Sequence, residues 1–149
     1  MRYKETGNCH KDFHLATNTT INHVLKEYGY DFLKELFRRT AQRVFREIYE
    51  SLKKGDFEPL IEYWKYYHER EGGKYELIRK EGEVVFHVIE CPAVKHLKER
   101  GVSINKNFPL QTFLLNEGWS EGTPFEITTE LIGDGESRQV IRRKDNASQ

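Results

Sequence analysis

The chain has 149 residues, and its 24 lysines and arginines are balanced by 24 aspartates and glutamates, so the formal net charge at pH 7 is zero. This balance disfavours a basic nucleic-acid-binding protein, and no stretch approaches the roughly 18 apolar residues of a membrane-spanning helix. The length predicts a single domain. Two cysteines are too few for a disulfide framework, so we expect a cytoplasmic protein without nucleic-acid or membrane partners.

The first half of the chain, about residues 12–72, has the periodicity of α-helices. Apolar residues recur at i, i+3, i+4 and i+7, and Gly29 and Gly55 interrupt the pattern where helices commonly end. The pattern predicts three helices, which cover residues 19–28, 31–54 and about 56–70.

The third predicted helix is rich in aromatic residues. Tyrosine and tryptophan combine an apolar body with a polar tip, so these rings either pack in the core or line a ligand cleft. Tyr63, Trp64 and Tyr67 are the candidate ligand-binding residues. The helix also carries more apolar surface than one small sheet can cover, which favours a homodimer.

The second half, about residues 73–143, alternates in the manner of β-strands. The β-branched and alternating runs, separated by turn residues, predict two hairpins with two short helices between them. We therefore predict an α+β protein, with a helical N-terminal half packed on a small, mostly antiparallel sheet of about four strands. The predicted strands cover residues 75–79, 84–90, 125–131 and 138–142, and the helices cover 92–100 and 107–117.

Cys91 precedes Pro92 at the point where a strand meets a helix. Proline is suited to the first helical turn, which places Cys91 at or next to the helix N-cap. Unpaired N–H groups and the helix dipole favour an anion there and can lower the pKa of a thiol. Cys91 is therefore either a reactive thiolate or a small buried residue at a strand end.

Histidines near the N-terminus supply candidate partners for chemistry. His10 and His14 are spaced i, i+4, which places both imidazoles on one face if the segment is helical, and Cys9 is adjacent. These three residues form an alternative site for a divalent metal. The prediction otherwise includes no cofactor.

A histidine that activates Cys91 has to come from outside its own strand. His87 precedes Cys91 by four residues, so an extended strand separates them by roughly 13 Å. His14 is the preferred general acid or base, because a nucleophile and its base usually come from different segments. His96, one turn into the following helix, is a further candidate ligand-binding residue.

Two segments, Asp12–Ile21 and Glu90–Leu97 with the following Gly101, resemble the L-2-amino-thiazoline-4-carboxylic acid hydrolase-like family. The similarity covers roughly residues 8–143. It implies hydrolytic opening of a cyclic amidine and points to Cys91, His14 and Asn18 as site residues. Related sequences often carry further cysteines in the C-terminal third, and this chain has none there. The order of elements also resembles vinyl-reductase-type small-molecule-binding domains.

These observations lead to two main hypotheses for a protein that takes a small-molecule substrate or ligand. In the first, the protein is a hydrolase acting on a ring or a C–N bond, with Cys91 as the nucleophile and His14 as the general acid or base. Asn18 would orient the substrate or stabilise developing negative charge. In the second, the protein is a non-catalytic binding or sensor domain and Cys91 is structural.

Overall fold

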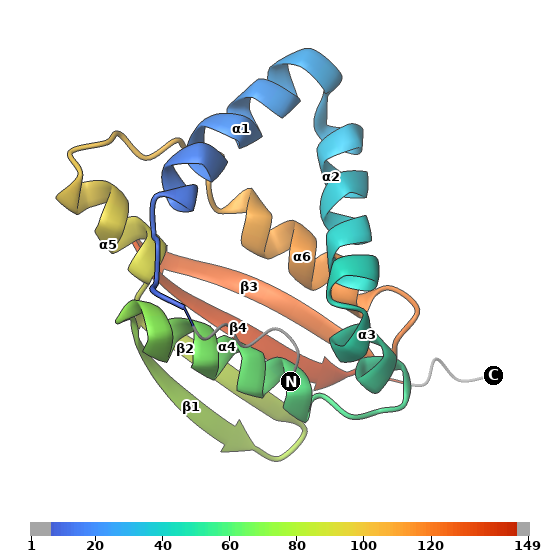
Figure 1. The fold of residues 1–149 in the computed structure, drawn as a ribbon. Coiled ribbons are helices and arrows are strands. Elements are labelled where there is room, and N and C mark those ends of the chain that lie inside the picture. Colours follow the sequence, from blue (N-terminus) through green and yellow to red (C-terminus); the bar gives the residue numbers. More distant parts are fainter. Residues whose placement is uncertain (1–6, 146–149) are drawn as a thin grey trace.

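The computed structural model describes residues 7–145 and confirms the α+β class (Figure 1). The helices precede and flank a sheet that is built from the second half of the chain. The helices are α1 (Phe13–Tyr28), α2 (Tyr30–Arg39), α3 (Arg46–Lys53), α4 (Glu58–Glu71), α5 (Pro92–Glu99) and α6 (Leu110–Ser120), with a π-helical turn η1 (Thr40–Val44). The strands are β1 (Lys74–Lys80), β2 (Glu83–Glu90), β3 (Phe125–Gly133) and β4 (Glu136–Arg143).

The sheet is antiparallel with the strand order β1-β2-β4-β3. Two hairpins, β1–β2 and β3–β4, therefore join through their inner strands. Helices α4 and α6 cover one face, where Trp64 and Trp119 pack with Phe86 of β2. Because side chains alternate along a strand, the positions that face these helices form the apolar core.

Helices α1 and α2 make a corner beside the sheet and close against α6 (Figure 1). Their contact is a second apolar cluster, formed by Ile21, Val24, Leu33 and Leu114. A third cluster fixes α5 through Leu97, which is fully buried. None of the helices within residues 7–145 has an apolar stretch of the length that a membrane crossing requires.

Helix α1 begins six residues before the predicted start at Thr19. Thr19 lies inside the helix, where the hydroxyls of Thr17 and Thr19 donate to the carbonyls of Phe13 and Leu15 one turn earlier. A threonine hydroxyl can form this bond within a helix, so it does not mark a helix start by itself.

The predicted helix over residues 31–54 is interrupted by the π-helical turn η1. At this turn α6 approaches so closely that a Cβ on Gly118 would lie 2.9 Å from Ala41 Cβ and 3.1 Å from Arg38 Cα. Gln42 Nε2 also donates to the carbonyl of Gly118 over 3.0 Å. The local widening of the helix thus coincides with a backbone-to-backbone contact, which an apolar period does not reveal.

Replacement of Gly118 by alanine should destabilise the protein by about 1–3 kcal/mol, because the methyl group would overlap the backbone of α2 and the side chain of Ala41. Urea unfolding of the variant measures this loss. Gly133→Ala is the matched control, since a Cβ at Gly133 meets nothing within 4 Å, and its effect should stay within about 0.5 kcal/mol. Equal stabilities for the two variants would contradict the proposed close packing.

Candidate functional site

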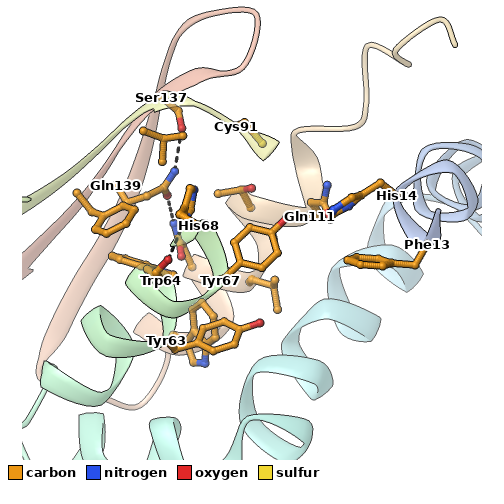
Figure 2. Close-up of a pocket in the computed structure, with 16 residues that line it drawn as sticks. Phe13, His14, Tyr63, Trp64, Tyr67, His68, Cys91, Gln111, Ser137 and Gln139 are labelled. Carbon is orange, nitrogen blue, oxygen red and sulfur yellow. Dashed lines mark hydrogen bonds between the residues drawn. The ribbon is translucent and has the colours of Figure 1, made fainter. Parts of the chain in front are cut away.

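A cavity of about 240 Å³ lies between α4, α6 and the covered face of the sheet (Figure 2). Tyr63, Trp64 and Tyr67 of α4 line it, as do Phe86 of β2 and Trp119 of α6. The three aromatic residues singled out in the sequence therefore share one cavity. Its walls are largely ring faces and edges, which suit a flat apolar ligand.

One wall of the cavity carries a hydrogen-bond network among polar side chains that the sequence analysis did not single out. The Asn116 amide donates to Thr129 Oγ1 over 2.8 Å and to Gln139 Oε1 over 2.5 Å. Thr129 donates to the same Gln139 oxygen, and Gln139 Nε2 donates to Ser137 Oγ over 3.2 Å. A sequence signal existed, because Ser137 and Gln139 occupy the inward positions of β4 where an apolar residue is expected.

A second polar group in the cavity wall is His68 of α4. Its Nδ1 donates to the Trp64 carbonyl over 2.7 Å, and burial lowers the pKa of the imidazole. His68 is therefore neutral near pH 7, with its proton on Nδ1. Its position also gave a signal, because His68 and Glu71 continue the i, i+4, i+7 stripe that Trp64 occupies, and polar residues on a buried stripe require partners.

His14 forms a buried pair with Glu71, a residue that the sequence analysis also missed. His14 Nε2 lies 3.0 Å from Glu71 Oε2, and both side chains are at most 4% exposed. Tyr67 Oη lies 3.5 Å from the same His14 nitrogen, and Cys9 Sγ lies 3.8 Å from the other carboxylate oxygen. The pair joins the start of α1 to the end of α4.

Opposing effects act on the Glu71 carboxyl. Burial alone would raise its pKa, but the hydrogen bond and charge of His14, with smaller contributions from Tyr67 and Lys11, lower the pKa below its ordinary value. Burial also raises the pKa of Tyr67 far above its usual value, with Glu71 acting in the same direction. Tyr67 is therefore a neutral hydroxyl at the cavity wall.

Cys91 is the N-cap residue of α5, as predicted, and lines the cavity. The lowered thiol pKa, however, is not found. Burial raises the pKa of Cys91, and the N–H groups of Val94 and Ala93 only partly offset this effect. In the part of the chain that the structure describes, no hydrogen bond links Cys91 to an imidazole, and His14 is paired with Glu71 through Nε2.

Two other residues proposed from the sequence lie outside the cavity lining. Asn18 is 6% exposed and holds the loop before α6, where it donates to the Ser103 carbonyl and accepts from the Asn105 N–H. His96 contacts Asp12 through Nε2 at 3.0 Å. Both residues tie α1 to the segment around α5, so their role in the structure is positional.

The alternative metal site is not formed by Cys9, His10 and His14. Within residues 7–145, no group of three or more histidine, cysteine, aspartate or glutamate side chains is arranged to hold a metal ion. The carboxylate of Glu71 engages both Cys9 and His14, whereas His10 is exposed. His10 and His14 also do not share a helix face, because α1 begins at Phe13, after His10.

The lining of the cavity contains no lysine, arginine, aspartate or glutamate. Burial raises the pKa values of Tyr67 and Cys91 and lowers that of His68, so these three groups are neutral, and His14 is already paired with Glu71. An ionised ligand would therefore lose its hydration with little compensation, and the cost of burying an unpaired charge is high. The cavity favours an uncharged ligand.

Comparison with known proteins gave no match to a family model, a curated protein or a solved structure. The resemblance to the L-2-amino-thiazoline-4-carboxylic acid hydrolase-like family thus stays a prediction. Function is therefore inferred from the geometry of the cavity.

Glu71→Gln should lower the free energy of unfolding at pH 7 by about 1.5–3 kcal/mol, because it removes a hydrogen bond to a buried charge. The folded-state pKa of Glu71 lies below its ordinary value of 4.5, so this stabilisation is present above that value. It is lost as the pH falls through the lower, folded-state pKa. Urea unfolding at pH 7, 4 and 3 should therefore show a difference from wild type that shrinks toward acid.

Glu136→Gln is the control for this series, because Glu136 also pairs with a histidine, His87, at 2.8 Å but is 39% exposed. Its effect should stay below about 1 kcal/mol. A Glu71→Gln difference that is constant with pH, or that grows toward acid, would contradict the assignment of Glu71 as the buried charged partner.

Proposed function

We propose that the protein is a small-molecule-binding domain that holds an uncharged, planar ligand in the cavity between α4, α6 and the sheet. The observation that carries this proposal is the combination of aromatic walls with a polar wall in a cavity that no lysine, arginine, aspartate or glutamate lines. Cavities of this type supply affinity through ring contacts and orientation through a few fixed polar groups. The raised pKa of Cys91 agrees with a structural thiol.

The chain contains a built-in reporter for this proposal. Trp64 and Trp119 are its two tryptophans, and both line the cavity. Phenol, a small uncharged ring, should therefore change the tryptophan fluorescence in a saturable manner when excitation is set beyond the absorption of phenol. Native mass spectrometry of the purified protein would reveal a ligand that is retained from the cell.

Leu115→Phe should weaken phenol binding by about tenfold or more, which corresponds to about 1.4 kcal/mol, because Leu115 lines the cavity and the larger ring would occupy it. Leu110→Phe is the matched control on the same helix, since Leu110 packs in the α1–α2–α6 cluster and does not line the cavity. A saturable response to phenol that survives Leu115→Phe unchanged would place the binding elsewhere and contradict the proposal.

A second candidate function is the hydrolase, and the buried His14–Glu71 pair favours it. The carboxylate accepts a hydrogen bond from His14 Nε2, so that in the neutral imidazole Nδ1 carries the lone pair, as in sites where a carboxylate orients a general base. With the pKa of Cys91 raised, a water molecule is the better nucleophile. Nδ1 would take its proton while the oxygen adds to the carbon of a cyclic amidine, and would return that proton to the ring nitrogen as the C–N bond of the ring breaks.

Hydrolysis of a cyclic amidine, followed by the release of its ring-opened product, tests this candidate. If His14 is the base, His14→Phe should reduce turnover by about a hundredfold or more, whereas Cys91→Ser should retain most of it. Loss of activity in Cys91→Ser with retention in His14→Phe would instead restore the thiol as nucleophile. Absence of turnover by the wild-type protein, together with saturable phenol binding, would leave the binding function alone.

A further inference from the structure

The polar side chains on one wall of the cavity form hydrogen bonds with one another, which limits the atoms that remain available to a ligand. Both N–H bonds of the Asn116 amide and both hydrogen bonds accepted by Gln139 Oε1 are used within the network. Gln139 Nε2 has one hydrogen engaged with Ser137 and a second that no described residue accepts. With its Oγ accepting that bond, the Ser137 hydroxyl is also a donor. This side of the cavity therefore offers donors.

The imidazole of His68 offers the complementary acceptor. Its Nδ1 donates to a backbone carbonyl, so in the neutral ring Nε2 carries a lone pair. Among the described residues, no hydrogen bond is made to this Nε2. The side chain is 7% exposed, but among the described residues the fully buried side-chain nitrogen or oxygen without a partner is Trp119 Nε1, so His68 Nε2 is not fully buried and stays available as an acceptor in the cavity wall. A ligand N–H would satisfy it.

The donor and the acceptor lie next to the same ring. His68 packs against Phe86 with a centroid separation of 5.1 Å, and Gln139 is the cross-strand partner of Phe86 in the β2–β4 pairing. Figure 2 shows His68, Gln139 and Ser137 on the same side of the cavity, opposite His14 and Phe13. A flat ligand that lies among the rings can thus meet a donor and an acceptor along one edge.

We infer that the ligand class is an uncharged, planar lactam-type heterocycle, whose ring N–H donates to His68 Nε2 and whose adjacent carbonyl accepts from Gln139 Nε2 or Ser137 Oγ. This inference rests on the proposed binding function and specifies it. A hydrocarbon ring would leave these three groups unpaired, and a carboxylate would present a charge where the lining has no lysine or arginine and its His14 is already paired with Glu71. A site built to hydrogen-bond a ligand N–H discriminates strongly against an analogue that lacks it.

Isothermal titration calorimetry with quinolin-2-one and N-methylquinolin-2-one tests the inference, because the two probes differ in the ring N–H. We expect the wild-type protein to bind quinolin-2-one at least about tenfold more tightly than its N-methyl derivative. Quinoline-2-carboxylate, which carries a negative charge, should bind more weakly still. Equal affinities for quinolin-2-one and its N-methyl derivative, or a preference for the carboxylate, would overturn the inference.

Two variants test which residues donate to and accept from the ligand along this edge of the cavity. His68→Phe keeps an aromatic ring and removes the acceptor, so the preference for quinolin-2-one over the N-methyl derivative should collapse toward one. Ser137→Ala should weaken both quinolinones about equally, because it alters the carbonyl side, or leave both unchanged if Gln139 Nε2 alone donates. Glu136→Gln, next to Ser137 but outside the cavity lining, is the control. Persistence of the tenfold preference in a folded His68→Phe protein would contradict the role of His68.

The same binding measurements distinguish a wrong ligand class from a wrong proposed function. If the cavity binds no small uncharged ring, then phenol and both quinolinones give no heat and no fluorescence change. If the cavity binds rings but has no lactam selectivity, phenol saturates the fluorescence change and the two quinolinones bind alike. The second outcome overturns the ligand class and leaves the binding domain.

Discussion

The structure depends on one constraint, which is that one face of the four-stranded sheet must be buried by α4 and α6, with Ile48 and Leu52 of α3 completing the apolar cluster. Large aromatic side chains meet this demand, because each ring covers much area from one position. Trp64 contacts both Phe86 and Trp119, with ring centroids 5.5 and 6.5 Å apart. Rings of this size enclose the 240 Å³ cavity while they form the core around it. The core and the candidate site therefore share Trp64, Phe86, Val88 and Trp119.

The close approach of α6 to α2 complements this arrangement. Gly118 allows the two backbones to meet, which fixes the position of α6 and with it Asn116 and Trp119 in the cavity wall. At the other end of the cavity, the His14–Glu71 pair joins α1 to α4. One end of the cavity is thus held by close packing and the other by a buried ionisable pair, whose contribution to stability depends on pH.

Cys91 shows how two effects at one atom compete. Its position at the start of α5 favours a thiolate through the N–H groups of Ala93 and Val94, as the sequence predicted. Burial acts against the charged form, and in this structure burial is the larger effect. The helix position could be inferred from Cys91-Pro92, whereas the degree of burial depends on elements far away in the chain. The sequence therefore identified the location of this thiol and left open whether it is a reactive thiolate or a buried residue, and burial favours the second.

The sequence by itself determined the class of fold, the two hairpins and the aromatic helix, because these follow from local periodicity and from turn residues. It also indicated Tyr63, Trp64 and Tyr67, which line the cavity. Only the tertiary structure decided the partners of the polar residues. His14 meets Glu71 across 57 residues, Asn18 holds a loop 85 residues away, and Asn116 reaches Gln139 from another element. Such pairings arise when separate segments pack together, and no spacing along a single helix or strand encodes them.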